Sequence, residues 1–357
     1  MKIAFNIDFD HTRFTGIGRY GIEIISAWNK SGNSSELWMD QSTRRNPPVI
    51  DKKNAKIKYY PRPRRITDHF WPMLHAKKNN INWVHSTNGN LLPSNSSFKQ
   101  IAVIYDLTPF HHSHMKTDND TLGWQERIKN IISKADCITV ISNSTLTDLL
   151  NLFPEVKEKA FLTTLGIDHF SSKKTLLNKK KHLLSVGTVE PRKNTDGLLK
   201  AYSILNKKNN DIPPLVLAGM DGFRADEYKK LASDLGISKK VRFTGFISDE
   251  ELATLYSEAY CLIHPAHHEG FGFTVPEAFT WKLPVVAANT SGLREFFKES
   301  AWMVDPTKPE SIADGIINAL SKGVTNSQSE NRIKLSKILT WANCATQTLS
   351  AIKTVDS

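Results

Sequence analysis

Two carboxylates and a glycine turn stand close together in the segment HPAHHEGFGFTVPEAFTWKLPVVAAN (264–289). Gly270 and Gly272 follow Glu269 and allow backbone N–H groups to turn inward before the next helix, which makes a cradle for anionic oxygens. Glu277 lies on the other side of this turn. Because carboxylates accept hydrogen bonds from hydroxyls, the segment predicts a site for a sugar and a ribose. Glu277 alone is equally typical of an exposed first-turn acid that complements the helix dipole.

A second cluster, GTVEPRKN (187–194), follows directly after the apolar run HLLSVG. Arg192 offers a planar fork of donors and Lys193 a compact charge, which together suit a diphosphate. Asn194 or Thr195 can cap the helix that follows. An Arg-Lys pair on a loop is more often a solvated surface pair, so that alternative stays open.

A third segment, GFISDEEL (245–252), indicates the end of a strand, a turn and a helix capped by Ser248. The backbone at Phe246 and Ile247 could receive a flat base. The same pattern also occurs in ordinary strand-to-helix connections.

The sequence GIGRYG (16–21) matches the G-x-G-x-x-G pattern of dinucleotide sites, and Asp40 follows about one βαβ step later. In such sites the first glycine ends the strand, so that the helix N-terminus meets the pyrophosphate. Here the apolar run ends near Ile7, and a polar loop is predicted over residues 8–15. Three interpretations stay open: a nicotinamide or flavin site, structural glycines at a loop-to-helix junction, or a glycine loop that approaches a substrate or phosphate. The third is favoured.

Strands and helices must position these clusters. Short β-branched runs, typical of strands, alternate with amphipathic segments, typical of helices, along the chain. Helices are expected at 18–30 and 122–135, among others. Strands are expected at 2–7, 36–39, 57–60, 82–86, 100–105, 136–142, 182–187, 214–219, 241–245, 259–265, 283–288 and 301–304. Near-continuous apolar strands between helices are typical of parallel sheets covered on both faces. The pattern predicts an α/β protein of two βαβ domains, with ligands beyond the carboxyl ends of the strands in a cleft between them.

Composition limits the class of protein. The 357 residues are 39% hydrophobic and 23% charged, as in ordinary globular proteins. No apolar run approaches the roughly 18 residues of a membrane span, no secretory leader is evident, and three scattered cysteines indicate neither disulfides nor a zinc site. A cytoplasmic protein is therefore expected. The formal net charge of +11 reflects either a solvated surface or attraction to nucleotide-sugar phosphates, lipid phosphates or nucleic acid.

In this order and spacing, the three segments resemble those of the family-4 retaining glycosyltransferases of GT-B fold. The chain is similar to the G-T-x-E-P-R-K-N loop, the S-D-E-E-L turn and the E-G-F-G-x-x-x-x-E motif of that family. The resemblance implies an acceptor domain over residues 1–168, a linker over 169–181, a donor domain over 182–338 and a helix over 339–357 that crosses back to the first domain.

The resemblance also implies residue roles. Arg192 and Lys193 would neutralise the leaving nucleoside diphosphate, Glu269 would bind hydroxyls of the transferred sugar, and Glu277 would bind the ribose. The remaining donor-binding residues implied by the motifs are Gly16, Gly18, Gly187, Thr188, Phe246, Ile247, Gly270, Phe271, Gly272, Phe273, Thr274 and Val275.

One motif departs from the family. Many relatives carry a His-Asp pair at the end of a strand in the first domain, where this chain has Tyr105 and Asp106. Both are kept in the predicted catalytic set. Either Tyr105 or one of His111, His112 and His114 takes the role of the imidazole, or the activity is weak or altered. A histidine cluster is also a metal-site candidate, but the resemblance implies no metal and no cofactor besides the nucleotide-sugar co-substrate.

The implied activity is transfer of a sugar from a nucleotide sugar to a glycan or lipid-linked glycan, with retention of configuration, in bacterial surface polysaccharide or lipopolysaccharide synthesis. The resemblance is to mannosyl- and rhamnosyltransferases and points to GDP-mannose. Alternatives are an NAD(P)-dependent oxidoreductase that uses GIGRYG and a GT-B-shaped nucleotide-sugar epimerase or phosphorylase. A nucleic-acid partner is not expected, because no aromatic-interleaved basic motif or helix-turn-helix spacing is present.

A basic stretch in the first domain predicts peripheral, salt-sensitive binding to the anionic inner face of a membrane, although a solvated loop explains it nearly as well. Its basic residues are Arg44, Arg45, Lys52, Lys53, Lys56, Lys58, Arg62, Arg64 and Arg65. The aromatic residues expected to meet headgroups are Tyr59, Tyr60, Phe70 and Trp71.

Overall fold

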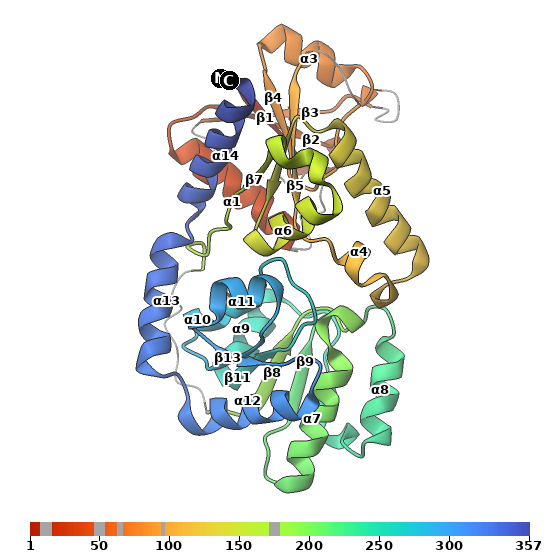
Figure 1. Ribbon diagram of the computed structural model, residues 1–357, viewed down its shortest axis with the longest axis vertical. Coiled ribbons are helices and arrows are strands. Elements are labelled where there is room, and N and C mark those ends of the chain that lie inside the picture. The colour runs from red at the N-terminus through yellow and green to blue at the C-terminus, as the bar shows by residue number, and fades with distance from the viewer. Residues whose placement is uncertain (8–15, 46–53, 63–66, 94–96, 171–178) are drawn as a thin grey trace. The chain divides into compact units, whose positions relative to one another are not determined.

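A computed structural model of the chain describes residues 1–7, 16–45, 54–62, 67–93, 97–170 and 179–357 (Figure 1). The chain divides into two compact units, which are described separately. Unit 1 comprises Met1–Leu107, Leu122–His169 and Leu339–Ser357. Unit 2 comprises Thr108–Thr121 and Phe170–Ile338. The segment 108–121, predicted to belong to the first domain, thus groups with unit 2.

Unit 1 is built on a parallel sheet whose described strands lie in the order β3-β2-β1-β4-β5-β6-β7. The strands are β1 Ile3–Ile7, β2 Ser35–Met39, β3 Ala55–Tyr59, β4 Trp83–Ser86, β5 Lys99–Ile104, β6 Cys137–Val140 and β7 Ala160–Leu162. The helices are α1 Gly16–Lys30, η1 Gln41–Arg45, α3 Trp71–Asn79, α5 Asp118–Lys134 (which begins in unit 2), α6 Asn143–Leu152, η3 Pro154–Lys159 and α14 Trp341–Asp356. Strands β1, β2, β4 and β6 are buried along their whole length, which explains their apolar composition.

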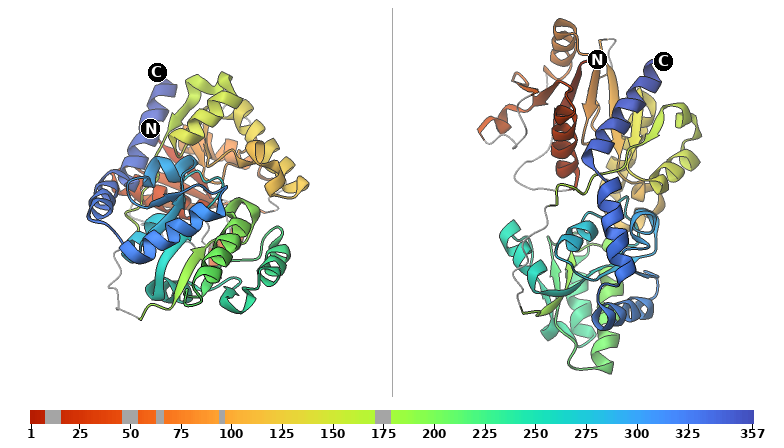
Figure 2. Two further views of the ribbon diagram at one scale, coloured as in Figure 1. Left: turned by 60° about the horizontal axis from the view of Figure 1, so that its bottom comes forward. Right: turned by 90° about the vertical axis from the view of Figure 1, so that its left-hand side faces the viewer.

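The C-terminal helix α14 belongs to unit 1 and packs against α1 (Figure 2). The residues just before α14 are hydrogen-bonded to the segment that follows β7, because the Ile167 N–H donates to the Leu339 carbonyl at 2.9 Å. Thr340 caps the helix by accepting from the Asn343 N–H at 3.2 Å. At the other end, Asp356 accepts from Trp83 Nε1 at 3.1 Å.

Unit 2 is built on a second parallel sheet, with its described strands in the order β10-β9-β8-β11-β12-β13. The strands are β8 His182–Val186, β9 Leu215–Ala218, β10 Val241–Phe243, β11 Ala259–His264, β12 Val285–Ala288 and β13 Trp302–Val304. The helices are α4 Thr108–His111, η2 Ser113–Met115, η4 Pro191–Lys193, α7 Thr195–Lys208, α8 Ala225–Asp234, η5 Ser238–Lys240, α9 Asp249–Glu258, α10 Thr274–Thr280, α11 Ser291–Phe297, α12 Pro309–Lys322 and α13 Asn326–Ile338. Tyr202 and Ile316, from α7 and α12, pack into one apolar core with the strands.

The predicted fold class is confirmed, since both units are Rossmann-like parallel sheets with intervening helices. All twelve predicted strands form, with shifted ends. The short, half-buried strand β7 was missed because its three residues carry no readable alternation. The predicted polar loop 8–15 and most of the predicted linker 169–181 lie outside the described residues.

Candidate active site

The strand order of unit 2 reverses between β8 and β11, which are neighbours in the sheet. The chain leaves β8 at Gly187 and β11 at Pro265, so the two following loops begin at the same edge. Open parallel sheets bind ligands beyond the carboxyl ends of the strands at such a reversal. The two loops that the sequence singled out, one with Arg192 and one with Glu269, therefore meet where this fold favours a ligand.

The loop after β8 is fixed by Asn194, which caps α7 from a left-handed conformation with φ of 59°. Its side-chain oxygen accepts from the Gly197 N–H at 3.2 Å. Its amide donates to the carbonyls of Pro265 at 3.0 Å and Pro306 at 2.7 Å. Asn194 thus fulfils the predicted capping role and also ties this loop to the segment after β11.

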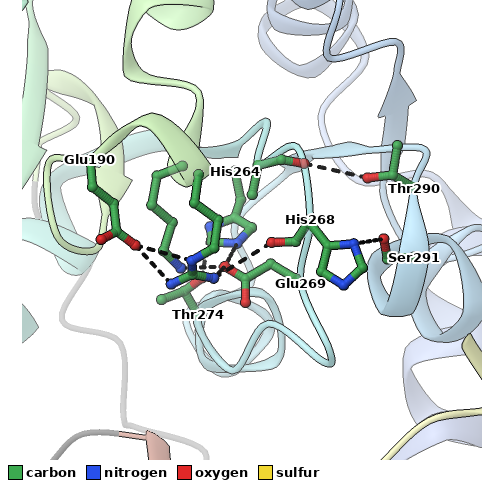
Figure 3. Close-up of polar contacts among 10 residues, drawn as sticks. Glu190, His264, His268, Glu269, Thr274, Thr290 and Ser291 are labelled. Atoms are coloured by element: carbon green, nitrogen blue, oxygen red, sulfur yellow. Dashed lines mark hydrogen bonds and ion pairs between the residues drawn. The ribbon is translucent and has the colours of Figure 1, made fainter. Parts of the chain in front are cut away.

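Two cations and two carboxylates meet between these loops (Figure 3). Glu269 Oε1 accepts from Arg192 Nη1 at 2.9 Å and from Lys193 Nζ. Arg192 Nη2 lies 2.9 Å from Glu190 Oε1. All four side chains are at most one-fifth exposed. The alternative of a solvated Arg-Lys pair is therefore wrong.

The electrostatics of this cluster favour an ionised carboxylate. Burial would raise the pKa of Glu269, but Lys193 and Arg192 outweigh it and hold that pKa well below its ordinary value. Removing either cation would leave a buried, poorly paired charge. An incoming diphosphate would compete with Glu269 for the same two cations.

Helix α11 contacts the turn after Glu269 and stabilises it. The Gly292 N–H donates to the Glu269 carbonyl at 2.9 Å. A Cβ on Gly292 would lie 2.1 Å from the Gly270 carbonyl oxygen, so a side chain there would displace the loop. Gly272 has φ of +91°, which favours glycine.

The other residues of this turn differ in what they can offer a donor. Phe271 is buried, with its ring 4.8 Å from that of Phe296, and supports the turn from within. Phe273 and Thr274 are half-buried. The Val275 N–H already donates to the Gly272 carbonyl at 3.0 Å. This amide is therefore already paired in the structure, and the donor-binding role of Val275 stays a prediction.

Glu277 lies in the first turn of α10 and is half-buried. Its Oε2 accepts from the Tyr256 hydroxyl at 3.0 Å, and the Tyr256 ring stacks on Trp281 at 6.2 Å. A carboxylate oriented by a buried tyrosine differs from a solvated acid that only complements a helix dipole. The predicted binding role is thus favoured over the simple dipole role.

The remaining loops of unit 2 lie where the sequence indicated. Gly187 and Thr188 lead out of β8, and a Cβ on Gly187 would lie 3.2 Å from Lys193 Cε. Phe246 is 67% exposed and precedes Ile247 in the turn before α9. Ser248 and Glu251 form the capping box of that helix.

The structure changes the interpretation of the unit 1 candidates. Gly16 and Gly18 lie in the first turn of α1 rather than in a loop. Tyr105 follows β5, and its hydroxyl donates to the Thr87 carbonyl at 2.5 Å. That proton is therefore already used, which weakens the prediction that Tyr105 replaces an imidazole. Asp106 lies beside it and is half-buried.

The three histidines after this strand belong to unit 2, where the rings of His111 and His112 lie near that of His268 and the ring of His114 lies near that of His112. The ring of His112 lies 5.7 Å from that of His268, and the ring of His111 lies 6.3 Å from it. His268 directly precedes Glu269, and its Nδ1 lies 2.9 Å from Ser291 Oγ. Among the described residues, no group of three or more His, Cys, Asp or Glu is placed to hold a metal ion.

Sequence reasoning missed three residues of this site. His264 and His268 lie in the quoted HPAHHEGFG segment but carry no spacing signal of their own. Tyr256 comes from a different helix and meets Glu277 only through the tertiary fold. A search for polar residues at the ends of apolar strands would have found His264.

Residues 167–336 match the family Glycosyl transferases group 1. The whole chain is similar to O-antigen chain mannosyltransferase B from Escherichia coli, at 24% identity over 99% of this chain and 100% of that protein.

Solved structures share the fold. Sucrose-phosphate synthase from Thermosynechococcus elongatus superposes with a TM-score of 0.73 at 18% identity, covering 99% of both chains. HepE from Anabaena, solved with UDP and glucose, gives 0.70 at 14% identity, also over 99% of both chains. The predicted resemblance to GT-B glycosyltransferases is confirmed by these findings. Within the part of the chain that is described, no helix is long and apolar enough to span a bilayer.

Proposed function

We propose that this protein is a retaining glycosyltransferase that moves a sugar from a nucleotide sugar to a glycan or lipid-linked glycan acceptor. The observation that carries the proposal is the cluster of Arg192, Lys193 and Glu269 at the β8–β11 reversal. It combines two cations for a diphosphate with a carboxylate for sugar hydroxyls. The match to group 1 supports the reaction class.

In the proposed reaction, the bond between the anomeric carbon and the diphosphate oxygen breaks, and an acceptor hydroxyl attacks the oxocarbenium-like sugar on the same face. The departing phosphate takes the proton of that hydroxyl. Arg192 and Lys193 stabilise the charge that develops on the diphosphate, so catalysis comes from positioning and electrostatics. Glu269 binds the sugar hydroxyls, and Glu277, oriented by Tyr256, binds the ribose.

The donor is proposed to be GDP-mannose, in polysaccharide or lipopolysaccharide synthesis. Support comes from the similarity to an O-antigen chain mannosyltransferase over the whole chain. A thermal-shift panel of GDP-, UDP-, ADP- and dTDP-sugars tests the base, since a ligand at 100 times its Kd stabilises by about 2.7 kcal/mol. Stabilisation by NAD(P) and by none of the nucleotide sugars would overturn the proposal in favour of an oxidoreductase.

Retention and metal independence have separate tests. The anomeric proton of the product, followed by NMR from the first turnovers, should show the configuration of the donor. Activity is expected to survive EDTA, because the proposed counter-charges are Arg192 and Lys193. Loss of activity on chelation that Mg²⁺ restores would contradict this assignment of the site.

Peripheral binding at the cytoplasmic face of a membrane is proposed on the described part of the basic stretch. Arg44 and Lys56 are exposed, and Phe70 and Leu74 of the same unit are 43% and 56% exposed. Tyr60, however, is buried, with the Trp71 ring 4.9 Å from its own, so Tyr60 is not the headgroup-facing aromatic that was predicted. Trp71 is half-buried, and its role stays a prediction. The predicted residues Lys52, Lys53, Arg64 and Arg65 lie outside the described residues.

Vesicle co-sedimentation tests this surface. We expect pelleting with anionic vesicles at low salt, release at high salt and no pelleting with neutral vesicles, with up to about 1 kcal/mol for each basic residue near the surface. Equal pelleting with neutral and anionic vesicles, or none at low salt, would contradict it.

A further inference from the structure

His264 is the last residue of β11 and lies five residues before Glu269, and neither the motifs nor the proposed reaction gives it a role. The side chain is 2% exposed. Its Nδ1 lies 3.1 Å from Thr274 Oγ1, and its Nε2 lies 3.5 Å from Glu269 Oε1 (Figure 3). The imidazole therefore stands between the start of α10 and the carboxylate that binds the two site cations.

These two contacts select one form of the ring. Glu269 is an ionised acceptor, so the imidazole nitrogen that faces it carries the proton. Nδ1 then accepts from the Thr274 hydroxyl. Burial lowers the pKa of His264 in spite of the nearby Glu269, which keeps the ring neutral.

The Nε2 contact is not complete in this structure. At 3.5 Å it exceeds a good N–H···O bond, and no other hydrogen-bond partner is recorded for this buried nitrogen among the described residues. Glu269 Oε1 meanwhile accepts from Arg192 and Lys193. His264 and Lys193 also line a small cavity of about 10 Å³.

Donor binding would change which groups donate hydrogen bonds to Glu269. Under the proposed function, Arg192 and Lys193 turn from Glu269 toward the diphosphate. A buried carboxylate that loses its donors either takes up a proton or rotates, and neither state presents an ordered acceptor to a sugar. The carboxylate therefore needs a donor that does not leave with the cations.

We propose that His264 is a positioning residue for Glu269 in the donor complex. Its Nε2–H closes onto Oε1 as the cations move to the diphosphate, and the ionised carboxylate keeps its second oxygen toward the sugar hydroxyls. Thr274 fixes the ring from the opposite side. This inference rests on the proposed function, and it concerns sugar recognition rather than phosphate binding.

Titration calorimetry with the full chain tests it, using GDP and GDP-mannose or the corresponding pair for the base that the thermal-shift panel ranks first. His264→Phe removes the N–H but keeps a ring. We expect its Kd for GDP to stay within about twofold of wild type, while binding of the nucleotide sugar weakens about tenfold, as for loss of one hydrogen bond to a charge.

Two matched variants separate positioning from packing. His264→Gln places an N–H near the position of Nε2 and should recover most of the nucleotide-sugar affinity. His264→Asn offers a polar group only near Nδ1 and should not. If the phenylalanine variant does not fold, the difference in nucleotide-sugar affinity between His264→Gln and His264→Asn carries the test.

The outcomes are distinct. If His264→Phe weakens the binding of GDP and of GDP-mannose by the same factor, the role of His264 is purely structural and the inference is overturned. Equal behaviour of the three His264 variants, with a wild-type protein that binds both ligands, would also overturn it and leave the proposed function intact. A wild-type protein that binds no nucleoside diphosphate and no nucleotide sugar would overturn both.

Discussion

The two units repeat one topology but place opposite chemistry at the reversal of strand order. In unit 1, where β1 meets β4, His85 is fully buried and its Nε2 lies 3.0 Å from the Tyr20 hydroxyl. The Tyr20 ring also contacts Tyr105 and Trp341, at 5.6 and 6.0 Å. In unit 2, where β8 meets β11, the corresponding place holds the ions of Arg192, Lys193 and Glu269.

The difference shows that the same topology creates a possible ligand site in both units, and that the side chains present determine whether it can bind a ligand. The neutral groups of unit 1 contact one another and Trp341 of α14, so this reversal point contributes packing. The cations of unit 2 are bound to carboxylates that a phosphate can replace. Four measurements test this difference between the units.

The largest effect is expected at the cations. Lys193→Ala or Arg192→Ala should lower kcat/KM by an amount equivalent to about 3–4 kcal/mol, as for loss of a donor at developing charge. Steady-state kinetics on variants shown by circular dichroism to be folded measures this loss. A loss of less than tenfold in both variants would mean that the charged cluster is structural, like its neutral counterpart.

Glu277 should affect donor binding next most strongly. Glu277→Ala removes the proposed ribose acceptor and should raise the donor KM about 10- to 100-fold, at about 1.5–3 kcal/mol for hydrogen bonds to a charge. Tyr256→Phe, which removes only the hydroxyl that orients Glu277, should act in the same direction but less strongly. Unchanged donor affinity in folded Glu277→Ala would remove the ribose assignment.

Unit 1 should respond to packing rather than to charge. A Cβ on Gly166 would lie 2.3 Å from the Trp341 backbone nitrogen, so Gly166→Ala should displace α14 and lower the free energy of unfolding by about 1–3 kcal/mol. The control is Gly123→Ala in α5, where a Cβ meets nothing within 4 Å and helix propensity predicts a gain of about 0.5–1 kcal/mol. Equal stability of the two variants would show that α14 does not pack in unit 1 as described.

The smallest effect is a pH dependence carried by His85, whose pKa burial lowers to about 3. The folded protein keeps this ring neutral, whereas the unfolded chain binds a proton below about pH 6.5. The stability from neutral His85 is thus complete above pH 6.5 and is lost as the pH falls toward 3, at about 1.4 kcal/mol per pH unit.

Denaturation of the wild-type protein and of His85→Gln at pH 7.5 and 5.5 measures this contribution of His85 to the free energy of unfolding. Glutamine keeps a polar group near the Tyr20 hydroxyl but does not titrate in this range. The wild-type protein should lose about 1.4 kcal/mol more than the variant between these pH values. An identical loss in both proteins would mean that the ring accepts a proton in the folded state.

Local patterns in the sequence predict the elements and the charged residues of the proposed donor site. Alternation of apolar runs and amphipathic segments predicts two parallel sheets, because strands buried on both faces must be continuously apolar. The GTVEPRKN and EGFG segments name Arg192, Lys193 and Glu269, since charged residues and glycines directly after buried strands lie at the ligand edge of a sheet.

The contacts between these side chains, in contrast, follow from the packing of each unit. Glu269 pairs with Arg192 across 77 residues, Tyr256 reaches Glu277 from another helix, and the Tyr105 hydroxyl donates to the Thr87 carbonyl. Strand order fixes these contacts, and that order depends on the packing of the whole unit rather than on any local pattern. The same cause explains why His264 could not be assigned from the sequence. Its role depends on Glu269 and Thr274, which lie on either side of its ring only once β11 and α10 are packed together.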